Sequence, residues 1–241
     1  MTGMLLFCGG EMVMDNLNYM SMNISKVFNQ FCNDLQNRTE IMTEDNIRYY
    51  WFVSMLRQDN LLDNYTLEQP YSEKPIQSTA LPDEELDLLY MDSSSHECFC
   101  FEIKFHRKSA KSSPAKTSQA GEVINDLQRL QQIPTSINGR KAHRLMLYVT
   151  DDIMHNYYTS MRQPNKVFGQ QLNDFYNAKI NAPLCLNFSG APKTFVESAN
   201  KSFKNNSNQI VIKNLQLIHS RDFTPCCPSF NGGCHVRLYE I

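Results

Sequence analysis

The chain has 241 residues, of which 41% are hydrophobic and 20% are charged, values typical of a soluble globular protein with a buried core. Its formal net charge of −2 excludes a globally basic nucleic-acid binder, so any such binding must come from a local basic patch. No apolar run approaches the ~20 residues that cross a bilayer, and we therefore expect no membrane contact.

The eight cysteines predict reduced thiols rather than disulfides. Their spacing is irregular, and two of them fall inside an expected strand, where a free thiol packs as a small apolar group. We therefore expect a cytoplasmic protein. The late group Cys226, Cys227, Cys234 and His235 fits a zinc site poorly, because such sites use paired ligands of the C-x2-C type.

The N-terminal part of the chain predicts two helices. Six of the twelve methionines fall within the first 22 residues, so we expect residues 1–14 to be poorly ordered or mis-assigned. Apolar residues recur at helical spacing over 16–35. A second helix is expected after Thr43, a suitable N-cap, because two acids follow it where the helix dipole favours negative charge.

The rest of the chain predicts an α/β fold with a mixed central sheet flanked by helices. The polar stretch 64–83 contains three prolines and predicts strand fragments or an irregular connection. The expected helices are 119–132 and 165–177, and the expected strands are 84–91, 96–105, 145–149, 184–188, 209–218 and 235–241. Because no repeat or linker divides the chain, we expect one domain over 15–241.

Two neighbouring strands of this sheet carry ionisable groups among apolar residues. In the strand 96–105 alternate residues share a face, so large apolar side chains lie on one side and Glu102 and Lys104 lie on the other. Pairing this strand with 84–91 so that the apolar faces coincide puts Asp87 on the same side. Charged groups at buried positions are costly to desolvate and need a metal, a partner or a function.

Two neighbouring carboxylates repel each other unless a cation lies between them. Magnesium suits this place because it prefers oxygen ligands and is held by one or two carboxylates plus a substrate phosphate. Such an ion activates water and stabilises charge on the phosphate, while Lys104 orients or deprotonates the water. The alternative is that Asp87, Glu102 and Lys104 form a structural network of ion pairs.

The acid in 85–90 and the E-x-K in 99–104 resemble the core of the PD-(D/E)XK nuclease superfamily, which has the restriction-endonuclease-like fold. The helix after Thr43 is similar to the first core helix of that family. The segments 121–130 and 144–150 are similar to the helix and strand that follow the E-x-K.

This resemblance covers a core of about 43–151 and leaves 152–241 as a C-terminal elaboration of one nuclease-like domain. It implies that Asp87 and Glu102 bind Mg²⁺ or Mn²⁺. It also implies that Glu44, in the first helix, supports the metal through water and belongs to the catalytic set with Lys104.

The sequence departs from the family pattern at one position, because the residue before Asp87 is leucine rather than proline. A Pro-Asp pair does occur upstream, which makes Asp83 a rival for the metal-binding acid. Glu40 is a rival for Glu44, and Glu85 shares a face with Asp87.

A basic run follows the E-x-K strand directly. Arg107, Lys108, Lys111 and Lys116 lie in it with no acid among them, so we expect this loop to contact nucleic-acid phosphates. A solvated surface loop is the alternative.

Together these features predict a Mg-dependent endonuclease that hydrolyses phosphodiester bonds, with DNA favoured over RNA. The alternative is a non-catalytic module that keeps the fold and binds nucleic acid or a protein. The sequence leaves open whether the chain forms a homodimer.

Overall fold

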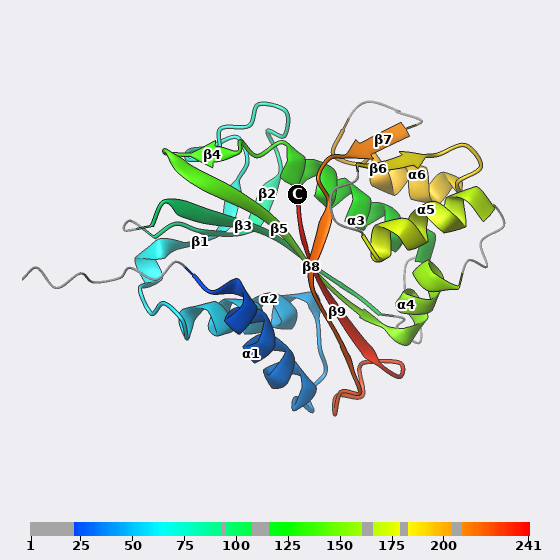
Figure 1. Cartoon of the computed structure of the whole chain (residues 1–241), viewed down its shortest axis with the longest axis horizontal. Helices are drawn as coiled ribbons and strands as arrows, with labels where there is room; N and C mark the ends of the chain where they lie inside the picture. The colour runs from blue at the N-terminus through cyan, green and yellow to red at the C-terminus, as the bar shows by residue number, and fades with distance from the viewer. Residues whose placement is uncertain (1–21, 93–94, 108–115, 161–165, 179–182, 204–208) are drawn as a thin grey trace, which may run out of the picture.

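A computed structural model describes residues 22–92, 95–107, 116–160, 166–178, 183–203 and 209–241. The expectation for residues 1–14 therefore lies outside the described residues. Within them the protein is α/β, with a mixed sheet through the middle of the molecule and helices on both faces (Figure 1). This confirms the predicted fold class at that level.

The central sheet has the strand order β1-β2-β3-β5-β9-β8, and the short β4 pairs with β5. The strands are β1 (Tyr65–Pro70), β2 (Glu85–Tyr90), β3 (Glu97–His106), β4 (Ser136–Ile137), β5 (Arg140–Asp151), β8 (Gln216–Phe223) and β9 (Cys234–Glu240). All neighbours pair antiparallel except β3 and β5, which are parallel. A parallel pair needs a crossover, and the helix α3 (Lys116–Gln131) provides it.

Helices α1 (Ile24–Gln36) and α2 (Glu44–Leu56) cover one face of the sheet (Figure 1). The other face carries α3 together with α4 (Asp152–Thr159), α5 (Lys166–Tyr176), α6 (Lys193–Ala199) and a small sheet of β6 (Leu184–Asn187) and β7 (Gln209–Ile212). A short 3-10 helix, Leu62–Asn64, precedes β1. Among the described residues, no helix combines the length and apolarity that crossing a membrane requires.

The predicted N-cap is confirmed, because the Thr43 side chain accepts a hydrogen bond from the backbone N–H of Asn46 at the start of α2. One prediction is wrong, and two helices were missed. The expected strand 209–218 is two strands, β7 and β8, in different sheets, since the chain turns between them at Asn214 with φ +57°. Helices α4 and α6 were not predicted, and both are short.

Each face of the sheet builds its own apolar cluster, as the alternation along β3 predicts. Phe101 and Ile103 pack toward α2, where Trp51 is fully buried. Cys100 packs toward α3, against residues such as Leu127. Each such large apolar side chain contributes roughly 1.5–3 kcal/mol when fully buried. The rigid sheet therefore fixes which residues of β3 face each helix layer.

Helix α3 is held tightly against its neighbour α6. A Cβ atom at Gly121 would lie 2.4 Å from the carbonyl oxygen of Phe195, so only glycine permits this approach. The close packing fixes the rotation of α3 and hence the residues that α3 presents to the sheet.

Candidate active site

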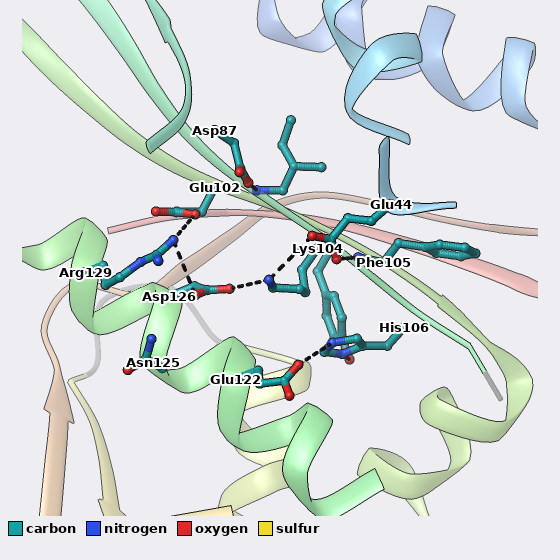
Figure 2. A network of polar contacts seen from close by, with 12 residues as sticks. Glu44, Asp87, Glu102, Lys104, Phe105, His106, Glu122, Asn125, Asp126 and Arg129 are labelled. Carbon is teal, nitrogen blue, oxygen red and sulfur yellow. Dashed lines mark hydrogen bonds and ion pairs between the residues drawn. The ribbon is translucent and has the colours of Figure 1, made fainter. Parts of the chain in front are cut away.

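Alternate residues of β3 pair with residues of α3 that lie three or four positions apart, and Figure 2 shows this ladder. Two residues of a strand advance about 6.6 Å, and four residues of a helix advance about 6 Å, so successive pairs stay in step. The nearest side-chain N–O contacts are Glu102–Arg129 at 2.6 Å, Lys104–Asp126 at 3.3 Å and His106–Glu122 at 3.4 Å. This confirms that Glu102 and Lys104 share the face opposite the apolar wall.

Asp87 lies where β2 and β3 separate. Pairing between these strands runs from Tyr90–Phe99 to Leu88–Phe101. Beyond it, the backbone N–H of Ile103 donates to Asp87 Oδ2 at 2.6 Å instead of to a strand partner. The carboxylate of Asp87 thus satisfies a backbone donor that the end of the strand ladder leaves free.

Asp87 also reaches toward α2, where its Oδ1 lies 2.9 Å from a guanidinium nitrogen of Arg48. Simple alternation predicts Leu86 and Leu88 on one face, yet Leu86 packs in the α3-side cluster and Leu88 in the α2-side cluster. The regular alternation of faces is therefore broken at Asp87. Its carboxylate bridges the two faces instead of lying flat on the Glu102 face.

Glu44, in the first turn of α2, joins the same network. Its Oε1 lies 3.6 Å from Lys104 Nζ and 2.9 Å from Arg48, and its Oε2 accepts from the backbone N–H of Phe105 at 3.4 Å (Figure 2). The predicted residues Glu44, Asp87, Glu102 and Lys104, which come from α2, β2 and β3, thus contribute to one network.

Glu102 is the most deeply buried carboxylate of this network, with 1% of its surface exposed. Its Oε1 accepts from the Tyr71 hydroxyl at 2.7 Å, and its Oε2 accepts from Arg129 at 2.6 Å. The same guanidinium also bonds Glu84 and lies 3.6 Å from Asp126. Arg129 therefore interacts with three carboxylates.

Burial controls the ionisation of these groups. It raises the pKa of Glu102 to about 8; Arg129 opposes this rise, whereas the charges of Asp126 and Asp87 add to it. Burial likewise raises the pKa of Asp87 to about 6, against the attraction of Arg48. Both carboxylates are thus destabilised as anions in the absence of a further cation.

Lys104 behaves in the opposite way. Burial alone would lower the pKa of its ammonium group, but the surrounding carboxylates, led by Asp126 and Glu44, outweigh burial and raise the pKa above its ordinary value. Lys104 therefore stays protonated at neutral pH.

The network carries more acid than base. Its buried or half-buried carboxylates are Glu44, Glu84, Asp87, Glu102 and Asp126, and its cations are Arg48, Lys104 and Arg129. Two negative charges are therefore in excess at full ionisation. An excess of this kind attracts a divalent cation.

The donor set fits Mg²⁺, because it consists of carboxylate oxygens and because Asp126 Oδ2 is buried without a hydrogen bond, facing only the Lys104 ammonium. The site is not preassembled, however. No three His, Cys, Asp or Glu side chains within the described ranges are arranged to hold a metal ion. Asp87 and Glu102 are instead held by Arg48 and Arg129.

The rival acids lie elsewhere. Asp83 and Glu85 are exposed, and Glu40 accepts a hydrogen bond from the Tyr50 hydroxyl. Among the predicted nucleic-acid contacts, Lys108 and Lys111 lie outside the described residues. The remaining two are Arg107, which donates to the Ser229 carbonyl at 3.3 Å, and Lys116, which is exposed at the start of α3.

Of the late cysteines, two are buried and packed within the fold and one is exposed. Cys227 donates to the Glu40 carbonyl at 2.7 Å, Cys234 is buried in the α2-side cluster, and Cys226 is exposed. His235 lies against Asp152 and Asp222.

Several residues of the network were not predicted from sequence. Glu122, Asp126 and Arg129 are spaced by four and three positions, which places them on one helix face, and this signal was available. Arg48 follows Glu44 by four positions, which is also a recognisable spacing. Tyr71 and Glu84 lie at the two ends of the irregular segment between β1 and β2, and no such spacing identifies them.

Comparisons of the chain with protein-family models, with curated proteins and with solved structures find no match.

Proposed function

We propose that this protein is a metal-dependent endonuclease that hydrolyses DNA phosphodiester bonds. The observation that carries the proposal is the convergence of Asp87, Glu102, Lys104 and Glu44 in one partly buried network with an excess of negative charge. Buried ionisable groups with displaced pKa values are concentrated at functional sites.

The order of elements supports a restriction-endonuclease-like core. Helix α2 is followed by the antiparallel strands β1, β2 and β3, then by α3, and then by β5, which runs parallel to β3. This is the order over 43–151 that the resemblance implies. The C-terminal elaboration adds β9 and β8 beyond β5 and the α4–α6 layer.

In this proposal Asp87 and Glu102 hold Mg²⁺ or Mn²⁺, and Glu44 supports the ion through water. When bound, the ion supplies an activated water and charge stabilisation at the phosphate. Lys104 stays protonated, so its role is to stabilise negative charge on the phosphate and orient water; it does not act as the general base. Asp126 positions Lys104 from α3.

A nucleic-acid substrate is proposed because the site lies next to the start of the basic run, and the choice of DNA over RNA follows from the resemblance to the nuclease superfamily. Lys116 is exposed at the first residue of α3, the same helix that carries Asp126 and Arg129. A phosphate backbone contacting Lys116 would run along α3 toward Lys104.

A second candidate function is a non-catalytic module that keeps this fold and binds nucleic acid or a protein. The observation that favours it is the pairing of both proposed metal ligands with arginines, Asp87 with Arg48 and Glu102 with Arg129. In that case the network stabilises the fold and binds no metal.

Calorimetry with Mn²⁺ and Mg²⁺ distinguishes the two candidates. We expect one or two ions to bind the wild type, and we expect Asp87→Asn and Glu102→Gln to abolish binding. The control is Asp222→Asn on β8, where Asp222 contacts His235 and Arg237, and it should leave binding unchanged. Cleavage of a DNA duplex should follow the same pattern. A folded wild type that binds neither ion, even with an oligonucleotide present, would refute the nuclease proposal and favour the non-catalytic module.

A further inference from the structure

The two acids proposed to hold the metal are each held by an arginine from a different helix. We propose that Arg129 occupies the place of the metal in the metal-free protein and that metal binding requires it to release Glu102. This inference rests on the proposed function, because it concerns how the same site acquires its ion.

Arg129 is placed to act as an internal counter-ion. Its guanidinium lies 2.6 Å from Glu102 Oε2 and 3.6 Å from Asp126, and it also bonds Glu84. These contacts lie on the α3 side of the site, where the Glu102 carboxylate faces (Figure 2). Both carboxylate oxygens of Glu102 are engaged, Oε1 by Tyr71 and Oε2 by Arg129, and Arg129 is the partner whose positive charge opposes a metal ion at this carboxylate.

The hydrogen bonds of Arg129 indicate that it can be exchanged. Its Nε is buried and donates no hydrogen bond, although an arginine that is fully engaged in a structural pair uses its donors. The other nitrogens of the guanidinium are shared among the carboxylates of Glu84, Glu102 and Asp126. An arginine with an unsatisfied buried donor gives up less on moving than one whose donors are all paired.

Arg48 repeats the arrangement on the α2 side. It lies 2.9 Å from both Asp87 and Glu44, and its buried Nε also has no hydrogen-bond partner. The Arg48 side chain is 33% exposed, whereas that of Arg129 is 12% exposed. Arg48 therefore has an easy path into solvent, and Arg129 is the residue that limits access of the ion to Glu102.

The charge balance gives the direction of the effect. Removing Arg129 takes one positive charge from a site that already has excess carboxylate, and it frees the Glu102 oxygen. Both changes strengthen attraction for a divalent cation once Glu102 is ionised, so the affinities are compared at about pH 8.5. The arginine therefore weakens metal binding in the wild type and sets the ion concentration at which the site fills.

The test measures the Mn²⁺ dissociation constant by calorimetry on the wild type, on Arg129→Met and on Arg237→Met. The matched control Arg237→Met removes another largely buried arginine that bonds a carboxylate, that of Asp222 at 2.6 Å, away from the site. We expect Arg129→Met to bind Mn²⁺ at least about tenfold more tightly than the wild type, and Arg237→Met to bind as the wild type does. Saturating Mn²⁺ should also raise the melting temperature of Arg129→Met more than that of the wild type.

A second variant keeps the test decisive if Arg129→Met fails to fold. Arg129→Lys retains the charge but has a single ammonium group in place of the fork, so it should bind Mn²⁺ more tightly than the wild type by a smaller factor. If the wild type binds Mn²⁺ and a folded Arg129 variant binds it with the same affinity, this inference is overturned and the nuclease proposal stays intact. Absence of Mn²⁺ binding by the wild type and by every folded Arg129 variant would overturn both.

Discussion

Two of the clusters of charged side chains on the central sheet, the network around β3 and a second one, differ in their balance of positive and negative charge. The second cluster lies where α4, β8 and β9 meet: His235 contacts Asp152 at 2.7 Å and Asp222 at 3.1 Å, and its ring stacks on His155 with centroids 3.8 Å apart. Arg237 completes it by donating to Asp222 at 2.6 Å. Here two carboxylates face one arginine and one imidazole bonded to both, whereas around β3 five carboxylates face three cations.

The two clusters also differ in their access to water. The side chains of Asp152 and Asp222 are 45% and 55% exposed, while that of Glu102 is 2% exposed. Exposed and paired charges contribute little to stability and need no further explanation. Buried charges in unequal numbers are costly, and the excess around β3 is the charge that the proposed metal ion would neutralise. Balance and burial together therefore distinguish the candidate active site from a structural polar cluster.

The largest expected difference between the clusters concerns the loss of an arginine. In the metal-free protein above about pH 8, where Glu102 is ionised, Arg129→Met should lower the free energy of unfolding by about 3–5 kcal/mol, because it leaves the buried Glu102 carboxylate without its cation. Arg237→Met should lower it by about 1 kcal/mol or less, because Asp222 remains hydrated. Urea denaturation in the presence of a chelator measures both. Equal losses would mean that the two clusters play the same structural role.

A second prediction separates catalysis from metal binding within the β3 cluster. Lys104→Met should reduce the rate of DNA cleavage by about 10²–10³-fold, because it removes a positive charge from the site of phosphate attack. Mn²⁺ binding should persist, since Lys104 is not a proposed ligand. Lys193→Met, on the exposed surface of α6, is the control and should cleave as the wild type does.

Cleavage that survives in Lys104→Met at the wild-type rate would remove Lys104 from the mechanism. Loss of Mn²⁺ binding together with cleavage would instead show that Lys104 holds the carboxylates in place.

The parts of the fold and site that are predictable from sequence are those encoded by local periodicity. The alternation along β3 predicts that Glu102 and Lys104 share a face, and the cap at Thr43 predicts the start of α2 beside Glu44. The spacing of Glu122, Asp126 and Arg129 places these three residues on one face of α3, the face that opposes Glu102, Lys104 and His106.

Non-local packing determines the rest. The last strand, β9, inserts between β5 and β8, and no local pattern specifies that pairing. Tyr71 and Glu84 reach Glu102 and Arg129 from an irregular segment whose path depends on the folded sheet. The break in alternation at Asp87 is also a tertiary effect, because the pattern of Leu86, Asp87 and Leu88 predicts a regular strand.

A third prediction concerns the opposite responses of the two clusters to pH in the metal-free protein. Burial raises the pKa of Asp87 to about 6 and that of Glu102 to about 8, from ordinary values of 3.8 and 4.5. Between about pH 4 and pH 8 the unfolded chain therefore binds fewer protons than the folded one. The contribution of Asp87 and Glu102 to the free energy of unfolding is therefore full below about pH 4 and is lost as the pH rises toward 8.

His155 acts in the other direction. Burial, together with the charges of His235 and Arg237, lowers the pKa of His155 from 6.5 to about 4. Between about pH 6.5 and pH 4 the unfolded chain therefore binds a proton that the folded chain does not, and stability falls as the pH falls. Because His155 is partly exposed, we expect a loss of less than about 1 kcal/mol.

Urea denaturation from pH 4.5 to pH 8, with a chelator present, separates the two responses. Glu102→Gln should remove the Glu102 part of the slope between about pH 4.5 and pH 8, and this change is seen alone above about pH 6.5, where His155 is neutral in both the folded and the unfolded chain. His155→Phe keeps a ring against His235 and should reduce only the acid-side loss. If Glu102→Gln leaves the alkaline-side slope as it is in the wild type, the Glu102 carboxylate is ionised and fully compensated in the metal-free protein. The contrast in charge balance between the two clusters would then disappear.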